Sequence, residues 1–243
     1  MARKIYMTNL KGGSGVTTCG VGLALALASL GERTAIFDGD TNCGSALLLG
    51  GCANMQTYTL SDYALGACRA KQTLISHPKE QNLWFCSSMG LEDLSFAGKA
   101  IAEIDGLFDY IILDKIASDK CDCAIIVTEP YITSIKCADV CKAKLSDSGV
   151  KDISLIVNKL NGGHIISGDV MSAQEIANIL KLPLRAVIPE DLSIALGREK
   201  TATKKAFKVA AENICGKRTD VCNVIRPYFG LGGFVKRKVR EAL

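Results

Sequence analysis

Three glycines and two threonines follow a short apolar segment near the start of the chain. They lie in Lys11-Gly-Gly-Ser-Gly-Val-Thr-Thr18, and an apolar helical pattern begins directly afterwards. Glycines let the backbone curl with its N–H groups pointing inward, and the N-terminus of a helix adds partial positive charge. A phosphate site is therefore predicted at Gly12, Gly13, Gly15, Val16, Thr17 and Thr18. The alternative is a glycine-rich turn that only packs a helix against a sheet.

The loop lacks the residue that usually balances phosphate charge. A generic phosphate loop reads G-x-x-x-x-G-K-[ST], but here Leu10 replaces the first glycine and Val16 replaces the lysine. Phosphoryl transfer depends on such electrostatic positioning, so hydrolysis is predicted to be strongly suppressed. Backbone N–H groups and Lys11 still allow weak binding of a di- or triphosphate. Lys115 is a candidate for a replacement cation.

Carboxylates end two other apolar segments. Asp38 ends one segment and is followed closely by Asp40, and Asp114 ends another. Ligands of open α/β sheets bind at the carboxyl ends of the strands, so these positions are candidates for function. Capping and solvation of single carboxylates is the alternative interpretation.

The remaining pattern predicts the elements that position these groups. Continuous apolar runs are typical of strands buried on both faces, and they alternate with segments that have helical apolar spacing. This order predicts an α/β fold with a doubly wound, mostly parallel sheet and helices on both faces. The predicted strands are residues 4–9, 34–38, 83–87, 110–114, 124–128, 154–158 and 184–188, and the helices include 17–30, 133–147 and 172–180.

Composition limits the class of protein. A chain of 243 residues with 48% hydrophobic content can bury one substantial core. Its net charge of +4 is too small to predict specific nucleic-acid binding. The amino end reads as a first strand and not as a signal peptide, and the apolar stretch 20–31 is too short to cross a membrane, so a cytoplasmic protein is expected.

Eleven cysteines are present, and without a signal peptide they are expected to be reduced and mostly buried. Two pairs, Cys121 with Cys123 and Cys137 with Cys141, could hold a metal or a cluster. Neither pair has the C-x-x-C spacing of a zinc site.

Several segments together resemble the MinD/ParA family of P-loop ATPases. The loop matches the family's deviant Walker A motif, K-G-G-x-G-K-[TS]-[TS], at seven of eight positions, with Val16 as the exception. Segments 36–40 and 110–114 resemble its second acidic motif and its Walker B strand. Segments 124–130, 155–159 and 186–191 resemble MinD members more than plasmid-partition members.

The resemblance implies ATP or ADP with Mg²⁺, bound in a homodimer that encloses the nucleotide. Lys11 would reach the partner's phosphates, and Asp40 would orient the attacking water. The remaining roles implied by the family are Thr17, Asp38 and Asp114 for Mg²⁺, Thr18 for a phosphate, and Asn158 with Pro189 and Asp191 for the adenine. The segment after Asp114 departs from the family, because the expected D-x-P-A-G stretch and switch helix are shortened.

The chain is predicted to divide into a domain at 1–229 and a basic tail at 230–243. A helix from Leu231 would place apolar side chains on one face and Lys236, Arg237, Lys238 and Arg240 on the other. This pattern suits an anionic membrane surface, although an amphipathic helix can equally dock on its own domain. The family resemblance favours membrane attachment of residues 231–243, with the protein peripheral on the inner face of the cell membrane.

Three functions follow as hypotheses. The first is a MinD-like nucleotide-binding switch in placement of the division site, with weak or absent ATP hydrolysis and a cell-division or other regulatory protein as partner. The second is a non-hydrolysing scaffold that has kept the fold and its surface. The third is an iron-sulfur or redox relative of the nitrogenase iron protein, in which Cys121 and Cys123 would serve as ligands.

Overall fold

The computed structural model describes residues 1–116, 121–196 and 200–229. Its centre is an eight-stranded sheet with strand order β3-β4-β2-β5-β1-β6-β7-β8, in which only β3 is antiparallel to its neighbour. The predicted doubly wound, mostly parallel sheet is confirmed. The strands are β1 (Arg3–Thr8), β2 (Thr34–Asp38), β3 (Ile75–Ser76), β4 (Leu83–Ser87), β5 (Tyr110–Asp114), β6 (Cys123–Thr128), β7 (Ile153–Leu160) and β8 (Leu184–Pro189).

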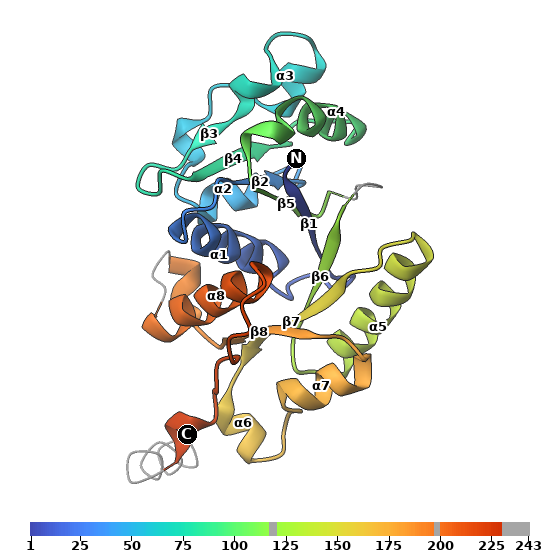
Figure 1. Cartoon of the computed structure of the whole chain (residues 1–243), viewed down its shortest axis with the longest axis vertical. Coiled ribbons are helices and arrows are strands. Elements are labelled where there is room, and N and C mark those ends of the chain that lie inside the picture. The colour runs from blue at the N-terminus through green and yellow to red at the C-terminus, as the bar shows by residue number, and fades with distance from the viewer. Residues whose placement is uncertain (117–120, 197–199, 230–243) are drawn as a thin grey trace.

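Helices cover both faces of this sheet (Figure 1). α1, α2 and α8 pack on one face, whereas α4, α5 and α7 pack on the other. The helices are α1 (Val16–Ser29), α2 (Ser45–Leu49), α3 (Leu60–Ala64), α4 (Ser95–Ile104), α5 (Ile132–Asp147), α6 (Gly162–Ile166), α7 (Ala173–Leu180) and α8 (Thr201–Ile214).

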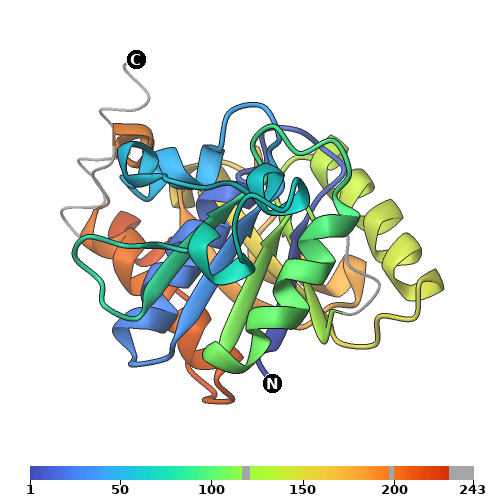
Figure 2. The same ribbon diagram turned by 90° about the horizontal axis from the view of Figure 1, so that it is seen from above.

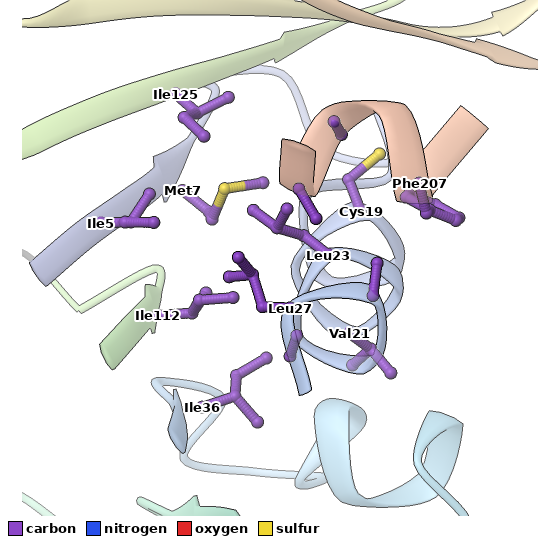
Figure 3. Close-up of a cluster of buried hydrophobic side chains, with 14 of the residues drawn as sticks. Ile5, Met7, Cys19, Val21, Leu23, Leu27, Ile36, Ile112, Ile125 and Phe207 are labelled. Atoms are coloured by element: carbon purple, nitrogen blue, oxygen red, sulfur yellow. The ribbon is translucent and has the colours of Figure 1, made fainter. Parts of the chain in front are cut away.

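The central helix α1 is buried between the sheet and α8. Leu23 and Leu27 point from α1 toward apolar side chains of β1 and β5, as Figure 3 shows. On its other side, Gly22 lets α8 approach closely, because a Cβ at this position would lie 2.5 Å from the ring of Phe207. Packing on two sides fixes the axis of α1, and with it the position of the loop that precedes it.

The carboxyl ends of three adjacent strands meet at one edge of the sheet. β2 pairs with β5, and β5 pairs with β1, so Asp38 and Asp114 lie directly opposite each other in register. The loop between β1 and α1 rises from the same edge (Figure 2). The three strand ends that the sequence analysis singled out therefore lie side by side, and their joint role as a ligand site stays a prediction.

Two predicted features lie outside the described residues. The tail at 230–243 is one, and residues 117–120 of the shortened segment after Asp114 are the other. Within the described ranges, no helix has both the length and the apolar character needed to cross a membrane.

Candidate functional site

The loop before α1 is open toward solvent at its tip. Gly13 and Gly15 have φ angles of 80° and 87°, and Gly15 is the N-cap of α1 without a side-chain cap. A Cβ placed at Gly12 or Gly13 would have no heavy atom within 4 Å. The first backbone N–H groups of a 14-residue helix thus follow a loop with free space around it. These features fit a phosphate group.

The end of β7 supports the loop. Asn158 is only 4% exposed, and its Nδ2 donates a hydrogen bond of 2.9 Å to the carbonyl oxygen of Ser14. The backbone of Gly15 lies so close to this amide that any Cβ there would collide with Nδ2 of Asn158. In this structure Asn158 therefore holds the loop in place, and a contact with adenine stays a prediction.

Asp114 is a buried carboxylate that has the Thr17 hydroxyl nearby but accepts no hydrogen bond of ordinary geometry within the described residues. It is 0% exposed, and neither of its oxygens accepts a hydrogen bond from a described residue. Burial raises the pKa of Asp114 to about 6; the nearby Thr17 hydroxyl lowers it, while the charge of Asp38 adds to the rise. A buried carboxylate left without a partner is costly, and a cation beside it would remove that cost.

Asp38 and Asp40 organise the loop after β2. Asp38 accepts hydrogen bonds from the backbone N–H groups of Asp40 (2.9 Å) and Ala46 (2.7 Å), although burial still raises its pKa. Asp40 accepts a hydrogen bond from the hydroxyl of Ser45, which lowers the pKa of Asp40. Asp38 thus lies beside Asp114 with its carboxylate fixed, whereas Asp40 has a local partner at the edge of the site.

The carboxylates and Thr17 fit a magnesium ion. Mg²⁺ is usually held by one or two carboxylates together with phosphate oxygens and water, and a threonine hydroxyl at this place in a phosphate loop is a further ligand. Asp38, Asp114 and Thr17 supply this donor set, and Thr17 is 8% exposed. Lys115 acts on the same carboxylates, because its charge lowers the pKa of Asp38 and opposes the rise at Asp114. The structure thus places the candidate cation Lys115 beside the aspartates.

Val16 and Thr18 lie on the first turn of α1. Val16 is 7% exposed and belongs to the core cluster that α1 forms with the sheet. Thr18 lines a cavity of about 460 Å³ between α1, α2 and the loop that contains Lys79. The side chain at position 16 therefore contributes packing and no charge.

Two lysines and one glutamate surround the loop in an arrangement that the sequence analysis missed. Glu129, at the end of β6, accepts hydrogen bonds from Nζ of Lys11 (2.6 Å) and from Nζ of Lys159 (2.8 Å). Nζ of Lys159 also donates to the carbonyl oxygen of Gly13 at 2.6 Å. Burial tends to raise the pKa of Glu129, but the two lysines outweigh burial and lower it. We call this arrangement the lysine–glutamate bridge.

Pro189 lines a second cavity near the ends of β7 and β8. This cavity has a volume of about 200 Å³ and is also lined by Asn161, Glu190 and Tyr228. Asp191 is engaged elsewhere: its carboxylate accepts hydrogen bonds from Ser193, from the N–H of Lys200 and from Thr203. Burial opposes ionisation of Asp191, but these donors lower its pKa to about 2. Asp191 thus ties the loop after β8 to α8, and its predicted contact with adenine stays a prediction.

Cys121 and Cys123, the proposed cluster ligands, lie away from the loop. Cys123 begins β6 and pairs in register with Ile5, which places it toward the amino edge of the sheet, opposite the loop. Burial raises its pKa to about 11, so its thiol is neutral at physiological pH. All cysteines are free, and no three metal-ligating side chains cluster within the described ranges. This placement gives no support to the redox hypothesis.

A glycine loop that opens an α-helix, beside two carboxylates in register on adjacent parallel strands, defines a P-loop nucleotide-binding protein. Residues 5–202 match the family described as the CobQ/CobB/MinD/ParA nucleotide binding domain. The chain belongs to this family.

Curated relatives and solved structures agree with this assignment. The chain is 34% identical over 208 residues to a putative septum site-determining protein MinD from Guillardia theta. This alignment covers 79% of this chain and 76% of that protein. It is 30% identical over 258 residues to a protein of the same name from Chlorella vulgaris, which covers 95% of this chain and 91% of the relative.

Among solved structures, the MinD cell division protein of Aquifex aeolicus superimposes with a TM-score of 0.82 at 26% identity, covering 91% of this chain and 100% of the other. The MinC:MinD cell division protein complex of the same organism superimposes with a TM-score of 0.82 at 25% identity. The superposition covers 90% of this chain and 98% of the other. The septum site-determining protein MinD of Pyrococcus horikoshii, complexed with Mg-ADP, superimposes with a TM-score of 0.76 at 24% identity. The superposition covers 88% of this chain and 96% of the other, which shows that the two share a fold.

Proposed function

We propose that this chain is a MinD-like nucleotide-binding switch in placement of the division site, with weak or absent ATP hydrolysis. The observation that carries the proposal is Asp114, which is buried beside Asp38 and Thr17 at the edge where the glycine loop opens α1 and accepts no hydrogen bond of ordinary geometry within the described residues. The names of the relatives from Guillardia theta and Chlorella vulgaris support the role in division.

The proposed ligand is ATP or ADP with Mg²⁺. Backbone N–H groups of residues 12–18 bind the phosphates, and Thr18 adds a hydroxyl. Asp38, Asp114 and Thr17 hold the cation, which supplies charge neutralisation at the phosphates when it is bound. The base lies near the ends of β7 and β8, where Asn158, Pro189 and Asp191 are the proposed contacts. The Mg-ADP complex of the Pyrococcus horikoshii relative supports this ligand class.

Calorimetry with Mg-ATP and Mg-ADP tests the proposal. We expect saturable binding with a dissociation constant of roughly micromolar order, about −8 kcal/mol. Adding EDTA, which removes Mg²⁺, should weaken binding, because Asp38 and Asp114 then face the phosphates without the intervening cation. The absence of heat at millimolar nucleotide would refute the proposed ligand.

The proposal includes a homodimer in which Lys11 contacts the partner's phosphates and Asp40 orients water. In this structure Nζ of Lys11 instead binds Glu129 of its own chain at 2.6 Å. Dimer formation therefore requires Lys11 to exchange that carboxylate for a phosphate. A cell-division protein is a further proposed partner, supported by the MinC:MinD complex of the Aquifex aeolicus relative.

We also propose peripheral attachment to the inner face of the membrane through residues 231–243. The support is the basic and apolar composition of this segment, which suits anionic headgroups. We expect deletion of residues 231–243 to abolish co-sedimentation with anionic liposomes while leaving nucleotide binding unchanged. Neutral liposomes are the control, and undiminished sedimentation of the shortened protein would contradict the proposal.

A non-hydrolysing scaffold is the second candidate function. One observation favours it: Val16 places an apolar, 7% exposed side chain where phosphoryl transfer needs a cation. Both candidates predict the same fold and surface. Phosphate release by the purified protein excludes the scaffold, whereas nucleotide binding without phosphate release is compatible with both candidates.

A further inference from the structure

Val16 leaves the phosphate loop without the lysine ammonium group that a generic phosphate loop has at this position, and other lysines of the chain can supply positive charge instead. Val16 is packed into the core and carries no donor. Two ammonium groups nevertheless lie at the loop, those of Lys11 and Lys159, and they are joined through Glu129. Lys159 is the one that contacts the loop backbone itself, at the carbonyl oxygen of Gly13.

The backbone of Lys159 adopts an unusual conformation that brings it there. Its φ angle is 55°, in the left-handed region that lysine seldom occupies, although it lies inside β7. The pairing of β7 with β8 is irregular between Val157 and Leu160, around this residue. Asn158, directly before it, holds Ser14 of the loop. Strained backbone persists where its surroundings impose it and often marks functional positions.

The lysine–glutamate bridge leaves net positive charge at the loop. Glu129 has one carboxylate and shares it between two ammonium groups, at 2.6 Å and 2.8 Å. Its side chain is 8% exposed, whereas those of Lys11 and Lys159 are 33% and 46% exposed. The cations thus face solvent and the carboxylate lies behind them. An anion that arrives from solvent meets the lysines first and competes with Glu129 for them.

We infer that Lys159 supplies the phosphate-binding cation that Val16 does not, and that Glu129 competes with the nucleotide phosphates for this lysine. The inference rests on the proposed nucleotide site and assigns a specificity residue within it. A triphosphate gains more from Lys159 than a diphosphate does, and adenosine gains nothing, because the contact is made to phosphate oxygens. Replacing Glu129 frees the lysine and strengthens binding.

The test compares Lys159→Met with a matched control by calorimetry. Lys142 on α5 is the control, since its Nζ likewise donates to a backbone carbonyl, that of Leu180, at 2.7 Å but away from the loop. Titrations use Mg-ATP, inorganic tripolyphosphate and adenosine. Lys159→Met is expected to weaken Mg-ATP and tripolyphosphate binding about tenfold. Adenosine affinity is expected to stay unchanged, as is every affinity of Lys142→Met.

Two further variants separate charge from folding. Glu129→Gln is expected to bind Mg-ATP about tenfold more tightly than the wild type. Adding Val16→Lys to Lys159→Met should restore affinity, because a cation returns to the loop from another position. Circular dichroism of each variant establishes that the fold is retained.

The outcomes distinguish this inference from the proposed function. If the wild type binds Mg-ATP and Lys159→Met binds it equally well, the inference is wrong and the nucleotide site stands. If the wild type and Glu129→Gln both fail to bind Mg-ATP and tripolyphosphate, the site and the inference fall together. A loss in Lys159→Met that extends equally to adenosine shows general damage to the site and also overturns the assigned role.

Discussion

Mg-ATP turnover by a Val16→Lys variant is expected to exceed that of the wild type by about 10²-fold. Removing one preorganised donor to a developing transition-state charge costs about 3–4 kcal/mol, which is about 10²- to 10³-fold in rate, and adding one should recover a similar amount. Val16 is the first residue of α1 and lies directly after the glycine loop, so a lysine at this position must leave the core cluster to place its ammonium group at the loop. Phosphate release under single-turnover conditions measures the effect.

Val16→Met is the matched control for this variant. Methionine has nearly the length of lysine and loses the same packing in the α1 core, but it brings no charge. If both variants turn over at the wild-type rate, the missing lysine does not limit hydrolysis. The limit then lies elsewhere, and the shortened segment that follows Asp114 becomes the first place to restore.

The outcome also depends on Glu129. A lysine at position 16 would add a third ammonium group to a loop that already has those of Lys11 and Lys159, and Glu129 would then have to compensate more positive charge than it does now. We therefore expect Val16→Lys to raise turnover more than it raises affinity. Lys159 acts as a phosphate-binding group in our inference, and a lysine that follows Gly15 is the one placed to stabilise the transferring phosphoryl group.

The sequence predicted the fold well because the strands of a parallel sheet are apolar on both faces. The segments 34–38, 83–87 and 110–114 coincide with β2, β4 and β5, because each apolar run ends in a polar residue: Asp38, Ser87 or Asp114. The rule that ligand sites lie at the carboxyl ends of strands identified Asp38 and Asp114 as candidates, and only the structure shows that they lie opposite each other. The weak two-residue strand β3 was not predicted, because Ile75–Ser76 is too short to show a pattern.

The lysine–glutamate bridge could not be predicted in the same way. Glu129 follows β6 directly and Lys159 lies near the end of the neighbouring strand β7, so the two residues are expected at the same edge of the sheet. Their contact with the loop depends on the left-handed backbone at Lys159 and on the irregular pairing of β7 with β8, and no residue spacing signals either feature. Lys115 was a candidate replacement for the loop lysine because it follows Asp114. In the structure the charge of Lys115 acts on the carboxylate of Asp114, whose pKa it lowers.

Gly15→Ala is expected to be the most damaging single-methyl change in the loop. Gly15 has a φ angle of 87°, where a Cβ costs about 1–2 kcal/mol. The added methyl would also collide with Nδ2 of Asn158, and displacing this buried amide from Ser14 costs about 1–3 kcal/mol more. The total, about 2–5 kcal/mol, should lower Tm by roughly 4–20 °C in calorimetric scans.

In Gly15→Ala the free energy of nucleotide binding should change by more than a general loss of stability would cause, because several backbone N–H groups of the loop must point at one ligand. Losing two such charge-assisted hydrogen bonds weakens binding by at least about 100-fold. Gly12→Ala provides the control within the same loop, since its φ is not positive and a Cβ there meets nothing within 4 Å. This variant should keep its Tm. Equal melting temperatures and affinities for the two variants would contradict the role of Asn158 as the support of the loop.

A double variant separates the loss of stability caused by backbone strain at Gly15 from the loss caused by the collision of the new methyl group with Asn158. Asn158→Ala removes the amide that the new methyl meets but leaves the positive φ in place. The Gly15→Ala/Asn158→Ala double variant should therefore be more stable than the sum of its single changes predicts, by about 1–2 kcal/mol, as is typical for residues in contact. Strict additivity would mean that backbone strain alone makes glycine necessary. A positive coupling would show that β7 and the phosphate loop are built as one unit, through which a change at the end of β7 can alter nucleotide binding.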